Sequence, residues 1–361
     1  MPKTLKINSH KRKNKTRKNK QIIISSDFES GNIVKLDSTT NNHVHLEIRG
    51  EKYEKQQTNK YRNWFYFKAK NVNKKTTFTI HDLKNFDDDW KGYTVCYSYD
   101  NKKWKRLPTK VDLKNLKMTW KINPKKSTIW FAYYVPYPFS KSKNLLKNMK
   151  VIGKSVKGNP IYMKKIGRGE TKVWLVSGQH PGETINSWIL EGFVKRIMER
   201  KILLRKYTFY IIPNANPDGN IKGNWYTTSQ GYNMNRNWFN NKSKEVKVIK
   251  KQLNKYGYDL VFDLHGDEGC KKHFLVARLT DKHPLHDKIN KALNKRNKHF
   301  QLKNFYNEKY MKTVNDTLDD FTGGITVEGA LKHPLRNNKT LQDEPLRIGY
   351  DIAEVLAEIW I

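Results

Sequence analysis

The sequence predicts an α/β domain with a mixed, largely parallel sheet flanked by helices, preceded by an all-β sandwich domain. Two observations predict this fold class. In the first part of the chain, short segments of alternating apolar and polar residues are separated by turn residues, which is typical of a β-sandwich. From about residue 150, strand-like segments alternate with amphipathic helices, which indicates an α/β domain. We expect a basic disordered tail over 1–24, the sandwich over 25–138 and the α/β domain over 139–361.

The composition fits two folded domains. A chain of 361 residues is long enough for two domains of ordinary size. Its 10 Trp, 19 Tyr and 15 Phe exclude wholesale disorder, because burying so many rings can offset the entropy lost on folding. Its apolar runs are far shorter than the roughly 20 residues that span a bilayer, so no membrane segment is expected.

The cysteine content and the N-terminal residues bear on the compartment. Cys96 and Cys270 cannot form a disulfide framework, and the first residues lack the apolar region of a secretory signal. We therefore expect a reducing compartment. The cytoplasm is the first expectation, with the nucleus, or a host cell or virion if the chain is viral, as alternatives.

The chain is strongly basic. It has 71 Lys and Arg against 34 Asp and Glu, a net charge of +37. Such a field attracts polyanions, including acidic protein tails and nucleic acid. Because Lys and Asn are abundant throughout, codon drift in an AT-rich genome explains the charge equally well. The segment 11–20 is dense in lysine and arginine, which predicts a disordered arm that serves as a nuclear address, binds nucleic acid or is only solvated.

The sandwich domain is predicted to contain seven short strands. Turn residues such as Asn123 and Pro124 separate them. The stretch 134–147 has two prolines and several lysines, and we expect it to connect the two domains. The predicted strands are 32–37, 43–49, 64–69, 76–80, 93–99, 117–122 and 128–134.

The α/β domain is predicted to contain four apolar strands and four amphipathic helices. The second helix is expected to end at Gly257, since glycine favours helix C-termini. The predicted strands are 173–177, 208–212, 259–264 and 325–327, and the helical stripes run over 185–197, 246–256, 285–293 and 352–359.

Polar side chains follow the predicted strands of the α/β domain. His180 and Glu183 come after 173–177, His265 comes after 259–264, and Glu328 comes after 325–327. In open α/β sheets, ligands bind outside the carboxyl ends of the strands. We therefore expect these side chains to meet at one edge of the sheet.

A metal site is predicted at this edge. Pro181 is expected at the first position of a helix and Gly182 is expected to leave room beside the backbone, so that His180 and Glu183 point the same way. With the distant His265 they would form a His₂Glu set. Three protein ligands with an open fourth position are typical of catalytic zinc. We expect one Zn²⁺ per chain.

Alternatives remain for two of these residues. His265 could be a strand-end histidine bonded to Asp263 or Asp267, which is compatible with zinc binding because a carboxylate often orients a metal-bound histidine. Glu328 is predicted to be the general base, since burial after an apolar strand would raise its pKa and suit proton transfer from a zinc-bound water. The alternative for Glu328 is a helix-capping or salt-bridged glutamate.

A binding role is predicted for the segment Asn-Met-Asn-Arg-Asn-Trp at 233–238. Asn235 and Arg236 supply donors on one loop, and a guanidinium suits fork recognition of a carboxylate. If the substrate is a peptide with a free C-terminus, Arg236 would hold that carboxylate and Asn235 would assist. The alternative is a surface arginine stacked on Trp238.

The motifs HPGET, NPDG, NMNRNW and DLHGDEG, with a late strand-borne glutamate, resemble those of the zinc metallocarboxypeptidases. The likeness is closest to the cytosolic-carboxypeptidase-like branch, which contains the protein deglutamylases. YSYDNKKWKRL and WFAYYVPYPFS are similar to the β-sandwich domain of that branch, so the resemblance covers about 25–361. It implies hydrolysis of a C-terminal peptide or isopeptide bond, with glutamate released in the deglutamylase branch. The resemblance also implies that zinc is bound by His180, Glu183 and His265. It implies that Glu328 is the general base and acid, and that Asn235 and Arg236 bind the substrate carboxylate.

The sequence departs from this family at one catalytic position. The family usually reads Gly-Asn-x-Arg before NRNW, and that arginine helps to polarise the scissile carbonyl, whereas Tyr226 stands there in this chain. Such a donor is worth about 10²–10³ in rate. The first prediction is therefore an active carboxypeptidase for acidic or glutamylated tails. The alternative is a catalytically weak or inactive protein of this fold that binds acidic C-termini.

Further expectations concern substrate selection. Tyr306 and Tyr310 are candidates for the family's mobile, substrate-capping tyrosine, and Lys309 or Lys312 could pair with a substrate glutamate. A nucleic-acid-associated protein that uses the basic arm is a third alternative, although no aromatic-interleaved recognition motif supports it.

Overall fold

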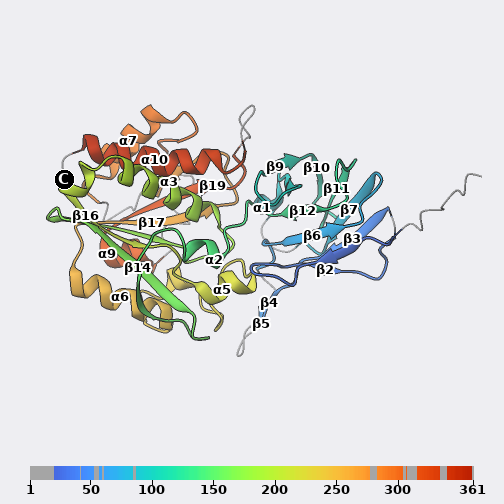
Figure 1. Cartoon of the computed structure of the whole chain (residues 1–361), viewed down its shortest axis with the longest axis horizontal. Coiled ribbons are helices and arrows are strands. Elements are labelled where there is room, and N and C mark those ends of the chain that lie inside the picture. Colours follow the sequence, from blue (N-terminus) through green and yellow to red (C-terminus); the bar gives the residue numbers. More distant parts are fainter. Residues whose placement is uncertain are drawn as a thin grey trace, which may run out of the picture.

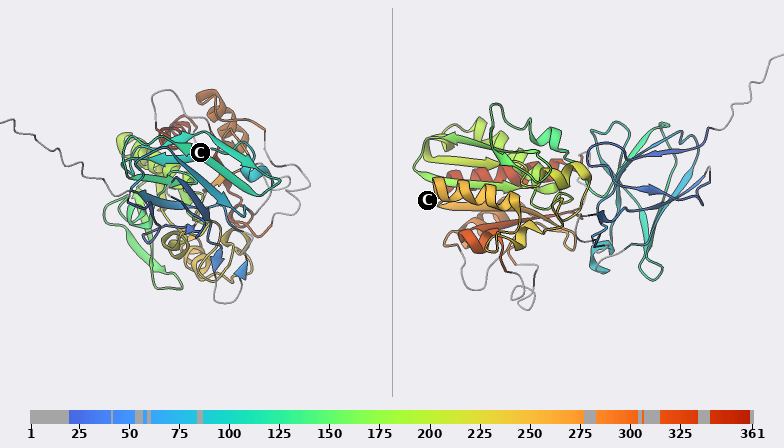
Figure 2. Two further views of the ribbon diagram at one scale, coloured as in Figure 1. Left: turned by 90° about the vertical axis from the view of Figure 1, so that its right-hand side faces the viewer. Right: turned by 90° about the horizontal axis from the view of Figure 1, so that it is seen from below.

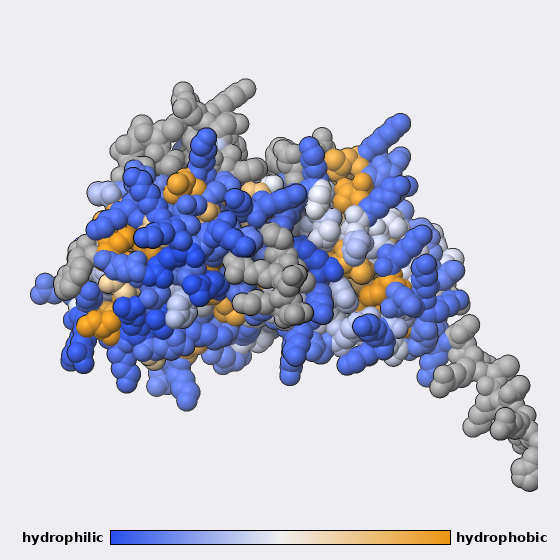
Figure 3. Space-filling model, turned by 90° about the horizontal axis from the view of Figure 1, so that it is seen from above, coloured by the Kyte–Doolittle hydropathy of each residue, from blue (hydrophilic) through white to orange (hydrophobic). Residues whose placement is uncertain are grey.

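The computed structural model describes residues 20–40, 42–52, 57–58, 61–83, 87–276, 283–303, 306, 315–333 and 340–359. It consists of an all-β lobe beside an α/β lobe, which confirms the predicted fold class (Figures 1 and 2). None of the helices in these ranges has the length and apolar character needed to cross a membrane. The face drawn in Figure 3 is mostly hydrophilic over both lobes, with small separate apolar spots.

The first lobe consists of two five-stranded sheets, in the orders β1-β6-β12-β8-β9 and β10-β11-β7-β3-β2. Neighbouring strands are antiparallel except for β3 and β7. A separate hairpin, β4–β5, and a short helix, α1, complete the lobe. The elements are β1 (Ile23–Ser25), β2 (Val34–Lys35), β3 (His43–Glu47), β4 (Glu51–Lys52), β5 (Gln57–Thr58), β6 (Tyr66–Lys70), β7 (Thr76–His81), α1 (Asp87–Trp90), β8 (Val95–Ser98), β9 (Lys105–Leu107), β10 (Thr109–Asp112), β11 (Lys117–Ile122) and β12 (Ile129–Ala132).

The tail predicted over 1–24 is wrong at its C-terminal end. Residues 1–19 lie outside the described residues, but Ile23 and Ile24 belong to β1, which pairs with β6. The Ile22 side chain is only 3% exposed, within the hydrophobic core. Three consecutive isoleucines favour a strand because β-branched side chains pack well on a pleated surface.

Aromatic rings fill the space between the two sheets. Phe67 and Phe131 come from the first sheet, and Phe78 and Trp120 come from the second. Phe78 stacks on Trp120 with ring centroids 5.6 Å apart, and its centroid lies 4.9 Å from that of Phe131. Large rings bury much apolar area each, so this core holds the lobe together by the hydrophobic effect.

The second lobe is built on a seven-stranded sheet in the order β13-β14-β16-β15-β17-β19-β18. The four strands β16-β15-β17-β19 are parallel, as predicted, and the outer strands β13, β14 and β18 run antiparallel to their neighbours. The strands are β13 (Lys150–Lys154), β14 (Pro160–Gly167), β15 (Thr171–Ser177), β16 (Tyr207–Ile212), β17 (Leu260–Asp267), β18 (Phe274–Leu275) and β19 (Ile325–Ala330).

Helices cover both faces of this sheet (Figure 1). α3, α7 and α10 pack on the face that carries Val173 and Leu175, and α6 and α9 pack on the face that carries Trp174 and Val176. Alternate side chains of β15 therefore pack into two different apolar layers, as expected for a strand buried on both sides. The helices are α2 (Phe139–Ser142), α3 (Ile185–Glu199), α4 (Leu203–Lys206), α5 (Pro217–Lys222), η1 (Met234–Arg236), α6 (Lys244–Tyr256), α7 (His286–Arg296), α9 (Leu318–Thr322) and α10 (Asp343–Glu358).

The two lobes share a buried junction. The predicted connection 134–147 is packed there rather than exposed: Tyr134, Val135 and Tyr137 are all buried, and helix α2 follows them. The Thr184 hydroxyl donates to the Val135 carbonyl oxygen at 2.8 Å, and the side-chain amide of Asn32 donates to the Gly223 carbonyl oxygen at 3.1 Å. These contacts fix the sandwich lobe against the loops at the carboxyl edge of the second sheet.

Candidate active site

The loop between β15 and α3 carries His180 and Glu183. The expectation that Pro181 begins a helix is wrong, because α3 begins at Ile185 and the preceding residues form a turn. In this turn the Glu183 N–H donates to the His180 carbonyl oxygen at 3.3 Å. The turn brings both side chains to the same side, where the His180 Nδ1 lies 2.8 Å from the Glu183 Oε1.

Gly182 is required in this turn for steric reasons. A Cβ atom at this position would lie 2.3 Å from the ring of Trp225. The Gly182 N–H also donates to the Trp225 carbonyl oxygen at 2.9 Å. The predicted role of this glycine, to leave room beside the backbone, therefore has a specific neighbour, the loop that follows α5.

His265 and Glu328 lie within strands rather than after them, which corrects the predicted strand ends. β17 continues to Asp267 and β19 continues to Ala330, and the parallel register pairs His265 with Glu328. The predicted strands ended at residues 264 and 327 because polar residues follow the apolar runs there. The backbone pairing nevertheless continues through these polar residues.

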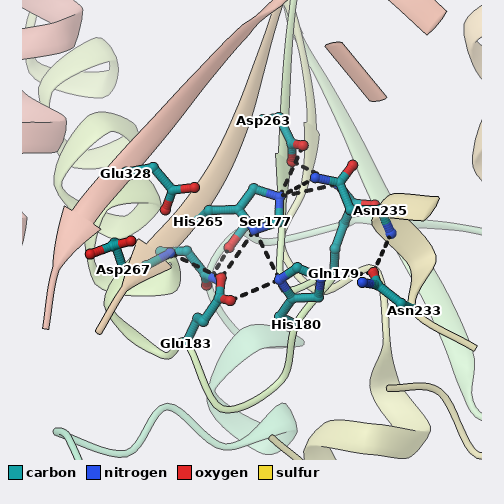
Figure 4. Close-up of polar contacts among 12 residues, drawn as sticks. Ser177, Gln179, His180, Glu183, Asn233, Asn235, Asp263, His265, Asp267 and Glu328 are labelled. Atoms are coloured by element: carbon teal, nitrogen blue, oxygen red, sulfur yellow. Dashed lines mark hydrogen bonds and ion pairs between the residues drawn. The ribbon is translucent and has the colours of Figure 1, made fainter. Parts of the chain in front are cut away.

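Three side chains converge at this edge (Figure 4). One ligand atom from each of His180, Glu183 and His265 lies within 4.8 Å of the others, and all three residues are buried. The Nδ1 of His265 lies 3.0 Å from the Glu183 Oε2 and 3.1 Å from the Nδ1 of His180. The structure therefore brings together the three residues predicted to bind a metal.

The spacing of these atoms fits a zinc ion. Two ligands at about 2.0–2.1 Å from a tetrahedral zinc are about 3.3 Å apart, close to the observed Nδ1–Nδ1 distance of 3.1 Å between His180 and His265. Both imidazoles also turn Nδ1 toward the carboxylate of Glu183, so three lone-pair donors face one point. Two imidazoles and one carboxylate suit a borderline cation such as Zn²⁺.

Each imidazole is held by a partner on its other nitrogen. The Nε2 of His265 lies 2.9 Å from the Asp263 Oδ2, and the Nε2 of His180 lies 2.9 Å from the Asn233 Oδ1. Gln179 donates to the other Asp263 oxygen at 2.7 Å. The contact with Asp263 is thus the predicted alternative for His265 and coexists with the metal-type geometry. Such partners fix the ring orientation and leave Nδ1 as the ligand atom.

The ionisable groups of the site shift one another's pKa values. Burial by itself would raise the pKa of Glu183, but His180 and His265 overcome this and lower it to about 2. Burial would lower the pKa of His265, yet Asp263 and Glu183 hold it well above its usual range. Glu183 is therefore an anion at neutral pH, as a metal ligand must be.

Glu328 is in a different electrostatic state. Burial raises the pKa of its carboxyl well above its usual range, and although His265 opposes this, Glu183 and Asp267 add to it. Its Oε2 is buried without a hydrogen-bond partner among the described residues. A carboxyl group with a free oxygen and a raised pKa beside a predicted metal site is suited to accept and return a proton.

Tyr306 contacts this carboxyl. Its hydroxyl donates to the Asp267 Oδ2 at 3.0 Å and to the Glu328 Oε1 at 3.3 Å. The other tyrosine candidate, Tyr310, lies outside the described residues, as do Lys309 and Lys312. Their roles remain predictions.

The two predicted carboxylate-binding residues occupy different positions. The Asn235 side-chain nitrogen lies 3.2 Å from the His265 Nε2, and the Asn235 side-chain oxygen accepts the Leu318 N–H at 2.9 Å, so Asn235 is buried next to His265. The Arg236 side chain is half-buried and donates to the Asn235 carbonyl oxygen at 2.6 Å. Trp238 lies in the core rather than at the surface, which argues against a surface stack of Arg236 on Trp238.

Tyr226 stands over His180. Their rings stack with centroids 3.9 Å apart and planes 21° from parallel, and Tyr61 of the sandwich lobe follows with its centroid 4.8 Å from that of Tyr226. The sequence indicated that Tyr226 replaces an arginine, but it gave no signal for this stack. Gln179 was also missed. Asn233 belongs to the predicted binding segment 233–238, but its contact with His180 was not predicted, because it depends on tertiary packing.

Comparisons with known proteins agree with this geometry. Residues 24–134 match the family model described as cytosolic carboxypeptidase N-terminal domain, and residues 139–261 match that described as zinc carboxypeptidase. An uncharacterized protein from Zymomonas mobilis subsp. mobilis is 31% identical over 275 residues, covering 71% of this chain and 70% of that protein.

Named relatives and solved structures are also similar. Cytosolic carboxypeptidase 2 of Xenopus tropicalis is 26% identical over 340 residues, covering 78% of this chain but only 34% of that relative. The chain thus spans about a third of that protein's length. A solved metallo-carboxypeptidase from Pseudomonas aeruginosa, in complex with (2-guanidinoethylmercapto)succinic acid, has a TM-score of 0.82 and 26% identity, over 93% of this chain and 98% of that one.

Proposed function

Because the chain belongs to the zinc carboxypeptidase family, with a cytosolic carboxypeptidase N-terminal domain, we propose that it is a zinc-dependent carboxypeptidase of acidic or glutamylated protein tails. The observation that carries this proposal is the convergence of His180, Glu183 and His265 beside the buried carboxyl of Glu328. The reaction would be hydrolysis of a C-terminal peptide or isopeptide bond.

The residues of the site divide the work. His180, Glu183 and His265 would hold one Zn²⁺, which supplies Lewis-acid polarisation and lowers the pKa of water. Glu328 would take the proton of the attacking water and return it to the leaving amine. Burial raises the pKa of Glu328 above its usual range, which favours return of the proton to the leaving amine.

Substrate orientation would come from Arg236. A guanidinium matches a terminal carboxylate with two parallel hydrogen bonds, and Arg236 is half-buried beside the site. Asn235, which is buried next to His265, would assist in carboxylate binding. The terminal residue would then be held while the bond before it is hydrolysed.

Acidic selectivity is supported by the charge of the chain. A net charge of +37 would draw acidic tails toward the chain and raise their association rate. The test compares release of the last residue from peptides that end in Glu or in Leu, and from poly-Glu tails, by mass spectrometry at low and high salt. We expect faster release from Glu peptides at low salt and a smaller advantage at high salt. Equal, salt-insensitive rates would contradict acidic selectivity.

A second candidate function is a carboxypeptidase fold that binds acidic C-termini with little or no turnover. The residue at position 226 favours it, because a tyrosine offers one hydrogen bond and no positive charge where the family has an arginine, and its ring is stacked on His180. The two candidates differ in whether an arginine at this position restores rate.

Two expectations about the wider setting remain proposals. The relatives' names support a cytoplasmic location. Nucleic-acid binding by the basic arm has no support beyond its charge; deletion of residues 1–20 should abolish any salt-dependent DNA binding that the chain shows. Unchanged binding after the deletion would dismiss this role of the arm.

A further inference from the structure

A buried acid from the sandwich lobe contacts the loop that stacks on the metal site. Glu51, in β4 at the junction of the lobes (Figure 1), is 3% exposed. Its Oε1 accepts the Tyr226 N–H at 2.6 Å, and its Oε2 accepts the Thr227 hydroxyl at 2.8 Å. Both carboxylate oxygens thus bind consecutive residues of the other lobe, which lie 175 and 176 positions away in sequence.

The segment 225–227 in turn contacts the ligand loop at two points. The Tyr226 ring stacks on the His180 imidazole, and the Trp225 carbonyl accepts the Gly182 N–H. Because Gly182 lies between His180 and Glu183 in sequence, a shift of this segment would displace both residues. Glu51 is therefore one step removed from the predicted metal ligands, through hydrogen bonds and a ring stack rather than by direct contact.

We propose that Glu51 is a positioning residue of the metal site: it fixes the segment 225–227 so that Tyr226 sets the plane of the His180 imidazole. The sandwich lobe then completes the active site rather than merely supporting it. The expected effect on catalysis rests on the proposed function, whereas the expected effect on metal binding does not.

The physical basis is the cost of leaving polar groups unpaired. Without the carboxylate, the Tyr226 N–H loses its partner at a buried junction, and the segment gains freedom to move until water or another acceptor satisfies it. The imidazole beneath it would then sample orientations that do not aim Nδ1 at the ion. Loss of such outer partners typically weakens metal affinity or activity by about 10–100-fold.

The test uses the full chain and two substitutions of Glu51. Glu51→Ala removes both hydrogen bonds, whereas Glu51→Gln keeps an acceptor for the Tyr226 N–H and a donor for the Thr227 oxygen while it removes the charge. Glu29→Ala is the matched control, since Glu29 also bridges the lobes, accepting the Ser140 N–H at 2.8 Å. Zn²⁺ affinity is measured by chelator competition, and the visible spectrum of the Co²⁺-loaded chain reports ligand geometry.

We expect Glu51→Ala to weaken Zn²⁺ binding by about 10-fold or more and to alter the Co²⁺ spectrum, with kcat lowered more than KM is raised. Glu51→Gln and Glu29→Ala should retain the wild-type affinity and spectrum. Wild-type affinity in Glu51→Ala would overturn the proposal. Equal losses in Glu51→Gln and Glu51→Ala would also overturn it, since the charge and not the hydrogen bonds would then matter.

A second variant, which keeps Glu51, tests the proposal if Glu51→Ala does not fold. Thr227→Val preserves the side-chain shape and removes one of the two hydrogen bonds, so a smaller loss of Zn²⁺ affinity in the same direction is expected. If Glu51→Ala does not fold, an unchanged affinity in Thr227→Val would contradict the proposal. A wild-type chain that binds Zn²⁺ but cleaves no peptide would refute the proposed function alone, because the order of Zn²⁺ affinities would still test Glu51.

Discussion

The sandwich core and the carboxyl edge of the second sheet are both buried, but they contain opposite kinds of side chain. In the sandwich, Phe78 and Trp120 pack ring on ring among other apolar groups. At the sheet edge, His265, Glu183 and Glu328 are buried together as ionisable groups. Burial of rings stabilises the fold, whereas burial of charges costs free energy unless partners or a metal compensate. The difference separates residues that maintain the fold from residues that perform chemistry.

The largest expected effect is at Glu328. Glu328→Gln keeps the shape of the side chain but removes the proton-accepting group, so kcat should fall by about 10²–10⁴-fold. Because the carboxyl has an unpaired buried oxygen and a raised pKa, its removal should not lower the thermal midpoint. Zn²⁺ content should be unchanged. Peptide release at the wild-type rate, or a large loss of stability, would show that Glu328 does not serve catalysis rather than the fold.

The opposite result is expected in the sandwich core. Trp120 is 1% exposed, so Trp120→Ala should destabilise the chain by about 3–5 kcal/mol, through lost burial and a cavity. Trp120→Phe is the control and should cost less, because a phenyl ring still fills part of the space and a buried Nε1–H without a described partner is removed. Denaturant unfolding measures both. The kcat of the folded fraction should equal that of wild type, and a parallel loss of kcat would contradict the separation.

Tyr226 tests the boundary between the two regions, since it stacks on Tyr61 of the sandwich lobe and on His180. If the missing arginine limits catalysis, Tyr226→Arg should raise the kcat of the Zn²⁺-saturated chain by up to about 10²–10³-fold, while loss of the ring stack should weaken its Zn²⁺ affinity. Tyr226→Phe keeps the stack without the hydroxyl and should leave the Zn²⁺ affinity unchanged. An unchanged or lower kcat in the Zn²⁺-saturated Tyr226→Arg chain would show that the missing arginine does not limit catalysis.

The smallest effect is expected at a surface turn of the sandwich. N–H donors from Lys103 and Lys102 lower the pKa of Asp100 to about 2. A lowered pKa in the folded state stabilises the fold at pH values above the unfolded-state pKa of about 3.9. This stabilisation is lost as the pH falls toward the folded-state pKa of about 2. The denaturation midpoints of wild type and Asp100→Asn should therefore differ most near neutral pH and converge below pH 4 or so. A constant difference across this range would contradict the shift.

The parallel core of the second sheet could be predicted because its strands are short apolar runs separated by helical stripes. The outer strands could not: β14 contains two consecutive lysines, Lys164 and Lys165, and a proline, so its sequence lacks the apolar continuity of a central strand. β1 was assigned to the tail for a related reason, since the basic residues before it hid a short apolar run.

The candidate site divides in the same way. His180, Glu183 and His265 were predictable as neighbours because parallel strands end at one edge, and a sheet topology then brings distant residues together. Glu51 and Tyr226 were not, because their contacts depend on how the two lobes pack, which no local pattern encodes. The helix start at Pro181 was wrong because a turn sterically matched to Trp225 occupies those residues.

The central claim is that His180, Glu183 and His265 share one metal ion. The most direct measurement is the zinc content per chain after equilibration with Zn²⁺ and removal of excess, for wild type, His180→Ala and Glu328→Gln. The account predicts one zinc per chain in wild type and in Glu328→Gln, and loss of that zinc in His180→Ala. A wild-type chain without zinc, or equal zinc content in His180→Ala, would contradict it.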